Sequence, residues 1–301
     1  MREKRRSVRS DPATALALST PRLGRSSGLE LVARRVLEGL YAGRHRSPFH
    51  GSSIDFAEHR PYQAGDELRA IDWRAFARTD RLLIKRHHDD RQLPLALIID
   101  TSASMAYGKP SKEEHARLTA AAMGLLALDQ GDSVRVIIGD KQTQALGPAG
   151  ALPLCTALTS TPSAGHFDIA QVLMGAVQSL TQRMLVVVIS DLLCEIEPVA
   201  EAAATAMARG HDVAVLQILD RSEIDLPAEW GRVILDDPEG VVKTVSCDAS
   251  LAKASYDAEM ANHMERCQTV LQAAGVDVQH WCTDENVVHV LGFWLERRRR
   301  R

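Results

Sequence analysis

The sequence predicts an α/β fold in which a mostly parallel sheet is flanked by helices. From residue 95 onward, short apolar runs of strand length alternate with longer helix-like segments. This alternation is typical of βαβ units, whose strands run parallel in one sheet. The composition agrees, because 45% hydrophobic and 25% charged residues are ordinary for a globular protein with a sizeable core.

The elements of this sheet follow from the apolar periodicity. Strands are predicted at residues 95–100, 133–139, 184–190, 212–219 and 276–281. Helices are predicted at residues 112–129, 168–181, 197–209 and 252–274. The last three helices are rich in Ala, which costs little in a helix. An edge strand is expected at 141–146, and two weaker strands are expected at 232–236 and 241–246.

The chain divides into four parts by composition. Residues 1–27 are basic and contain Ser, Pro and Gly, so we expect a disordered tail. Residues 28–92 form a separate segment packed on the core, with a helix over about 29–41 and a strand at 82–87. Residues 93–295 form the α/β domain, and the arginines of 296–301 form a second basic tail. We expect both tails to be solvated; the alternative is contact with an acidic partner or nucleic acid.

Charge, cysteines and hydropathy narrow the class of protein. The net charge of −3 gives no reason to expect nucleic acid or an anionic membrane as the partner. The five cysteines are scattered and show no zinc spacing, which favours reduced thiols in the cytoplasm. We find no convincing signal peptide and no apolar run long enough to cross a bilayer. The sequence therefore predicts a cytoplasmic protein without a membrane span.

The most informative motif follows the strand at 95–100. Asp100, Ser102 and Ser104 stand at alternate positions directly after it. In open α/β sheets the carboxyl ends of the strands are where ligands bind. A carboxylate with neutral oxygens suits a hard cation such as Mg²⁺, and one carboxylate does not neutralise it. The alternative is a capping loop in which these side chains satisfy backbone amides.

A second carboxylate, Asp191, follows the strand at 184–190. If this strand and the strand at 95–100 are neighbours, Asp100 and Asp191 meet across one crevice. Two carboxylates at one rim need a cation or a raised pKa. The alternative for Asp191 is an N-cap of the next helix.

A third group lies in the segment 60–78, which is rich in Arg, Asp and aromatic residues. We interpret it as a structural network of ion pairs, or else as a partner-binding face, since Arg, Tyr and Trp are common interface residues. Its members are Arg60, Tyr62, Asp66, Arg69, Asp72, Trp73 and Arg78.

These motifs resemble two known signatures. DTSASM after an apolar strand, with ISD further on, resembles the metal-ion-dependent adhesion site of von Willebrand factor A domains. The upstream segment GSSIDFAEHRPYQAGDELRAIDWRAFAR resembles the signature of the family called "domain of unknown function 58". The resemblance implies a Rossmann-like three-layer sandwich with an N-terminal helix-plus-strand extension. It also implies Mg²⁺, or Mn²⁺ or Ca²⁺, held by Asp100, Ser102, Ser104 and Asp191.

One position departs from the pattern. Similar chains carry Gly-Gly-Thr-Asp before a helix, whereas this chain has Gly165, His166, Phe167 and Asp168. Phe167 stands at the place of the threonine and cannot ligate a metal. We therefore expect cation binding to be weaker or absent, or to use Thr159, Ser160, Thr161 or Asp168 instead.

The resemblance also implies a function. Related proteins are often encoded beside MoxR-type AAA+ ATPases, which implies such an ATPase and an unknown protein client as partners. We predict a non-enzymatic adapter in which a partner's acidic group completes the coordination of the bound cation. One alternative is a Mg²⁺-dependent phosphoesterase-type hydrolase, which ranks lower because no general base is evident near Asp100. The other is a structural interaction module without metal.

Overall fold

The computed structural model describes residues 26–45, 56–61, 76, 81, 83–87, 94–139, 141–161, 163, 165–235 and 245–299. The chain forms two compact units, one of Met1–Tyr41 with Leu93–Arg301 and one of Ala42–Gln92. In the smaller unit β1 (Phe56–Pro61) pairs antiparallel with β2 (Leu83–His87). The strand expected at 82–87 is β2, whereas β1 was not expected.

The larger unit contains a sheet of six strands. In space the order is β10-β7-β6-β3-β4-β5, and every neighbouring pair is parallel except β4 and β5. The strands are β3 (Leu95–Ile99), β4 (Ser133–Ile138), β5 (Lys141–Leu146), β6 (Leu185–Ser190), β7 (Asp212–Leu219) and β10 (Asp277–Cys282). Counted along the chain within this sheet, the order is the 3-2-1-4-5-6 of Rossmann-like folds. The predicted fold class is confirmed, as is the edge position of the strand at 141–146.

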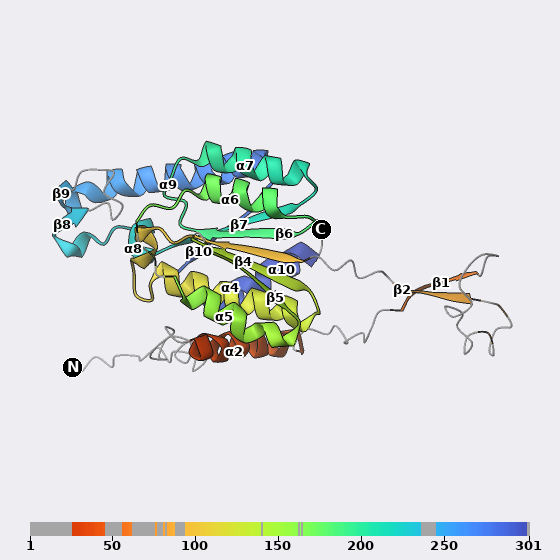
Figure 1. The fold of residues 1–301 in the computed structure, drawn as a ribbon. Coiled ribbons are helices and arrows are strands. Elements are labelled where there is room, and N and C mark those ends of the chain that lie inside the picture. Colours follow the sequence, from red (N-terminus) through yellow and green to blue (C-terminus); the bar gives the residue numbers. More distant parts are fainter. Residues whose placement is uncertain are drawn as a thin grey trace, which may run out of the picture. The chain divides into compact units, whose positions relative to one another are not determined.

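Helices cover both faces of this sheet and make three layers (Figure 1). Leu97 and Ile99 of β3 pack on one side, whereas Ala96 and Ile98 face the other, as alternation along a strand requires. The first side carries α4 (Lys112–Asp129), α5 (Ala151–Thr159), α10 (Val287–Arg299) and α2 (Ser26–His45). The second side carries α6 (Ile169–Ser179), α7 (Ile196–Ala208) and α9 (Ala249–Ala273).

The boundary between the two units lies after Tyr41, whereas the sequence suggested a boundary at residue 28. Helix α2 buries Leu29, Val36 and Leu37 in the same core as α4 and α5, so most of this helix belongs to the larger unit. Helix α2 packs on the larger unit because its apolar face must be covered by another apolar surface. The smaller unit begins at Ala42.

The arginines at the carboxyl end are partly structural. Helix α10 continues to Arg299, so residues 296–301 are not a tail throughout. Arg298 forms an ion pair with the buried Asp277 at 3.2 Å, and a second one with Asp212. A buried carboxylate is costly without a partner, which explains why the helix carries this arginine inward.

Smaller elements complete the larger unit. They are η2 (Ala103–Ala106), η3 (Pro148–Gly150), α8 (Arg221–Ile224), η4 (Ala228–Trp230), and the antiparallel pair β8 (Arg232–Leu235) and β9 (Val245–Asp248). The strand expected at 232–236 corresponds to β8. Of the strand expected at 241–246, only residues 245 and 246 are among the described residues, and they begin β9. Helices α5 and α10 were not expected.

All five cysteines are free, and none of the described helices is long and apolar enough to cross a membrane.

The packing of α4 on α5 predicts the effect of two glycine substitutions. A Cβ atom on Gly124 would lie 2.6 Å from Cδ2 of the buried Leu154, whereas a Cβ on Gly175 of α6 would meet nothing within 4 Å. We expect Gly124→Ala to lower the free energy of unfolding by about 1 kcal/mol, because overpacking outweighs the gain in helix propensity. Gly175→Ala should raise it by about 0.5–1 kcal/mol. Urea unfolding measures both, and equal shifts in one direction would contradict the packing argument.

Burial of His115 in α4 predicts a dependence of stability on pH. Desolvation lowers the pKa of this imidazole from 6.5 to about 4, although the Thr283 backbone and Asp284 oppose the shift. The unfolded chain therefore binds a proton more readily, and stability present above pH 6.5 is lost as the pH falls toward 4. The linkage relation gives a loss of about 2 kcal/mol from pH 7 to pH 5 for this group.

Urea unfolding at pH 7 and pH 5 tests this contribution. His115→Gln should show a smaller loss of stability between the two pH values than the wild type. The exposed His289 offers a matched control, His289→Gln, which should behave as the wild type does. An unchanged pH dependence in His115→Gln would contradict the prediction.

Candidate cation site at the carboxyl edge of the sheet

The site begins where the strand order reverses. β3 has β4 on one side and β6 on the other, so the loops that follow β3 and β6 leave the sheet side by side. Such a switch point is where open α/β sheets bind ligands. Asp100 follows β3, and its N–H donates to the carbonyl of Ile189 in β6 at 2.9 Å. The predicted meeting of Asp100 and Asp191 across one crevice thus has a structural basis.

The carboxylate of Asp100 is buried, with 3% of the residue exposed. Its Oδ1 accepts a hydrogen bond from Ser102 N at 2.7 Å, and its Oδ2 accepts one from the Ser190 hydroxyl at 2.5 Å. Burial, followed by the negative charge of Asp191, raises the pKa of Asp100 to about 6. The hydrogen bonds oppose that shift without cancelling it. The charged form of Asp100 is therefore costly in this crevice, because the carboxylate is shielded from water and lies near a second negative charge.

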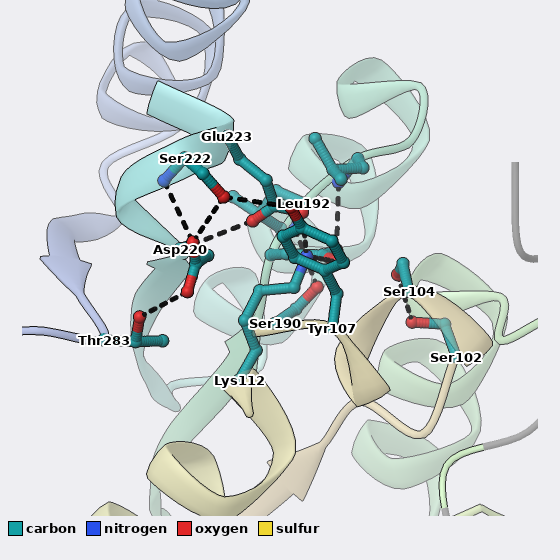
Figure 2. Close-up of polar contacts among 12 residues, drawn as sticks. Ser102, Ser104, Tyr107, Lys112, Ser190, Leu192, Asp220, Ser222, Glu223 and Thr283 are labelled. Carbon is teal, nitrogen blue, oxygen red and sulfur yellow. Dashed lines mark hydrogen bonds and ion pairs between the residues drawn. The ribbon is translucent and has the colours of Figure 1, made fainter. Parts of the chain in front are cut away.

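Two hydroxyl groups lie together beside this carboxylate. Ser102 Oγ and Ser104 Oγ are 2.9 Å apart on the short turn η2 (Figure 2). The turn is held by Ala103 N, which donates to the carbonyl of Gly165 at 2.9 Å. Ser102 and Ser104 thus present two neutral oxygens from one turn.

The loop after β6 holds Asp191 rigidly. Asp191 Oδ1 accepts from Leu193 N at 3.2 Å, and its backbone carbonyl accepts from Gln217 Nε2 at 2.8 Å. Leu192 adopts a φ of 55°, which is uncommon for a residue with a side chain. Leu192 N donates to Ser190 Oγ at 2.9 Å, and His263 Nε2 lies 2.8 Å from the Leu192 carbonyl. These contacts fix a backbone conformation that costs energy, which is typical of functional loops.

Lys112, which the sequence analysis did not single out, contacts the same aspartate. Its side chain is 0% exposed, and its Nζ lies 2.7 Å from Asp191 Oδ2 and 2.5 Å from Glu223 Oε1. Burial opposes the charged form, but the negative charges of Asp191 and Glu223 outweigh it and raise the pKa of Lys112. The Lys112 ammonium is thus a buried cation between two carboxylates.

The sequence contained one signal for this lysine. Lys112 is the first residue of α4, whose N-cap Ser111 forms a capping box with Glu114. A positive charge is unfavourable in the first turn of a helix, so a lysine there needs a negative partner. That partner comes from loops distant in sequence, which is why the pattern alone did not reveal it.

The polar contacts continue toward β7 and β10 (Figure 2). Glu223 of α8 accepts from Asp220 N through Oε2 at 2.8 Å, and burial raises its pKa. Asp220 in turn accepts from the hydroxyl of Thr283 at 3.0 Å. Tyr107 OH lies 2.9 Å from Ser222 Oγ, and its ring centroid lies 5.9 Å from the Lys112 ammonium. The site is therefore one end of a row of polar groups along the sheet edge.

The remaining residues that the sequence singled out lie in several parts of the structure. Asp168 is the N-cap of α6 and accepts from Gln171 N at 2.9 Å. Phe167 is 9% exposed and packs in the core, so it serves there as an apolar side chain. The carbonyl of Thr161 accepts from Arg117, while its buried hydroxyl has no partner. Arg60 lies in β1, whereas Tyr62, Asp66, Arg69, Asp72, Trp73 and Arg78 lie outside the described residues.

A cleft of about 540 Å³ adjoins the loop that carries Asp191. It is lined by Leu193, Cys194, Glu195, Ile196, Glu197, His263 and Arg266. Arg266 and Glu197 form an ion pair at 2.6 Å across it. Burial, followed by the nearby Asp100 and Asp191 charges, raises the pKa of Cys194 to about 12, so its thiol is not a reactive nucleophile.

The donor set suits a hard divalent cation. Carboxylates and hydroxyls are the oxygen ligands that Mg²⁺ prefers, and an oxygen that accepts one hydrogen bond retains a second lone pair. When ionised, Asp100, Asp191 and Glu223 with Lys112 sum to −2 (three negative charges and one positive), which one divalent cation balances. Among the described residues no three His, Cys, Asp or Glu side chains gather to hold a metal. A cation held here would therefore need hydroxyl or backbone oxygens in addition to the carboxylates.

Three comparisons place the chain among known proteins. "Uncharacterized protein Rv1480" of Mycobacterium tuberculosis (strain ATCC 25618 / H37Rv) is 29% identical over 306 residues, covering 96% of this chain and 91% of that protein. The crystal structure of the hypothetical protein BatB from Bacteroides thetaiotaomicron aligns with a TM-score of 0.47 and 18% identity, over 69% of this chain and all of that one. The SpRpn10 VWA domain aligns with a TM-score of 0.38 and 10% identity, over 65% and 92%.

The family comparison covers most of the chain. A family model described as "Protein of unknown function DUF58" matches residues 58–266, which is well over half of the 301 residues. The chain therefore belongs to the DUF58 family.

Proposed function

We propose that this protein is a non-enzymatic adapter that binds a protein partner through a divalent cation at the carboxyl edge of its sheet. The observation that carries the proposal is the convergence of two buried carboxylates and two hydroxyls between β3 and β6. Burial first, and the negative charge of Asp191 second, raise the pKa of Asp100 to about 6, and a bound cation would offset both effects.

Each residue has a distinct task in this proposal. Ser102 and Ser104 supply neutral oxygens, and Asp100 and Asp191 supply the negative charge that attracts the cation. The bound cation would offer an open coordination position to a carboxylate of the partner. The cleft beside Asp191 gives the partner room to approach, and its exposed Leu193 adds apolar contact area.

The hydrogen bonds of the site favour binding over catalysis. The Ser190 hydroxyl donates to Asp100 and accepts from Leu192 N, and Ser190 is 0% exposed, so its oxygen is engaged inside the fold and shielded from an incoming substrate. The Lys112 ammonium is held by two carboxylates. His280 contacts the Gln217 amide, at 2.6 Å from Nδ1 to Oε1. Within the described part of the chain, the polar groups at this edge thus hold one another in place.

The proposed partner is a MoxR-type AAA+ ATPase, with a protein client of that ATPase. This assignment rests on the resemblance to relatives that are encoded beside such ATPases. We place the complex in the cytoplasm, which the five free cysteines support. The ATPase would supply mechanical work, and the adapter would recognise the client or dock on the ATPase.

One prediction of this proposal concerns the binding of the cation. Mg²⁺ or Mn²⁺ should raise the melting temperature of the full chain and give heat on titration, and Asp100→Asn should abolish both responses. Asparagine keeps an oxygen acceptor for Ser102 N but removes the charge that attracts the cation. Because this substitution also removes a buried charge beside Asp191, we expect no loss of folding.

Asp168→Asn is the matched control for this experiment. Asparagine caps helices as well as aspartate does, so α6 should be unaffected and the cation response retained. Loss of the response in Asp168→Asn would move the site to the loop before α6. If the wild type showed neither heat nor a thermal shift, cation dependence would be excluded and the protein would be a metal-free module.

The second prediction concerns the partner. Wild-type protein should co-migrate on size exclusion with the MoxR-type ATPase of the same organism, and Asp100→Asn should not. Comparing variants avoids chelators, which would also remove Mg²⁺ from the ATPase. Cation-dependent hydrolysis of a phosphoester substrate that disappears in Asp100→Asn would instead identify a hydrolase. Equal co-migration of wild type and variant would exclude this site as the docking point.

A further inference from the structure

We propose that Lys112 competes with a divalent cation for Asp191 and thereby sets the cation affinity of the site. This inference deepens the proposed function, because it concerns the same aspartate. Lys112 comes from α4, whereas Asp191 comes from the loop after β6, and the two meet at 2.7 Å. The lysine is thus a positioning residue built into the site from a separate element.

The contact occupies one oxygen of Asp191. Oδ2 accepts from the ammonium, and Oδ1 accepts from Leu193 N. Each oxygen retains one lone pair, so Asp191 can still attract a cation, but part of its negative charge is already compensated. A second cation in this crevice must share Asp191 with the ammonium.

Burial makes that sharing costly. Both Lys112 and Asp191 are almost fully shielded from water, with side-chain exposures of 0% and 3%. Repulsion between two positive charges is poorly screened in such surroundings. The ammonium is attached to the chain and cannot leave, so it lowers the affinity for any divalent cation that Asp191 attracts.

Glu223 limits this effect. Its Oε1 lies 2.5 Å from the same ammonium, and its Oε2 accepts a hydrogen bond from Asp220 N. Lys112 is therefore divided between Asp191 and Glu223. If the charge of Glu223 is removed, Asp191 becomes the only ionic partner of Lys112 in this group. Less of the negative charge of Asp191 then remains for a divalent cation.

Calorimetric titration of the full chain with MgCl₂ and with MnCl₂ tests the inference. Lys112→Met should bind at least tenfold more tightly than the wild type, and Glu223→Gln should bind more weakly. The double variant Lys112→Met/Glu223→Gln keeps the charge sum of the wild-type group, because one positive and one negative charge are removed together. It should also bind at least tenfold more tightly, since Asp191 is free.

A distant lysine provides the matched control. Lys253 of α9 forms ion pairs with Asp225 and with Asp257, and neither partner belongs to the cation site. Lys253→Met should bind Mg²⁺ as the wild type does. Tighter binding in Lys253→Met would mean that net charge alone determines the affinity, which would overturn the specific role of Lys112.

The outcomes separate this inference from the proposed function. If the double variant binds no more tightly than the wild type, the lysine has only a structural role and the inference is wrong. If the wild type binds no cation but the double variant gains binding, the inference holds and the cation-dependent adapter fails. Should Lys112→Met not fold, the double variant and Glu223→Gln decide, because neither makes the net charge of this group more negative than in the wild type. An unchanged or tighter affinity in Glu223→Gln would also overturn the inference.

Discussion

Buried negative charge at the ends of β3 and β6 is the constraint on which the rest of this site depends. Two parallel strands at a switch point bring Asp100 and Asp191 to one crevice, away from water. Buried carboxylates require hydrogen bonds and a compensating charge. The amide of Ser102, the hydroxyl of Ser190 and the ammonium of Lys112 meet that requirement in part. The remaining negative charge is the reason for proposing a cation site in this crevice.

The same requirement links elements that are far apart in the chain. Lys112 at the start of α4 connects the loop after β6 with α8, and Asp220 connects α8 with the end of β10 through Thr283. At the opposite edge of the larger unit, Arg298 compensates the buried Asp277 in a similar way. In both places a basic residue at a helix end forms an ion pair with an acid at a strand end, which joins helix and sheet layers in addition to their apolar packing.

The proposed cation binding and the stability of the fold require opposite states of the Asp191 carboxylate. A binding site needs charge that remains available, whereas a stable fold needs that charge paired. Lys112 is shared between Asp191 and Glu223, so under the proposed function part of the charge of Asp191 would remain available to a cation. The left-handed backbone conformation of Leu192 has a similar cost. It is energetically unfavourable, and it fixes the loop that carries Asp191.

The sequence by itself determined the layers, most strands and helices, and the positions of Asp100, Ser102, Ser104 and Asp191 at strand ends. These follow from local patterns, namely apolar periodicity and the polar residues that end each apolar run. Only the tertiary structure decided that β3 and β6 are neighbours, that α2 joins the larger unit, and that Lys112 lies beside Asp191. Asp168 illustrates the same limit of local patterns. Its position in the sequence suggested a metal ligand, and only the structure shows that its carboxylate caps α6. The physical reason is that ion pairing depends on distances between segments remote in the chain, which no local pattern encodes.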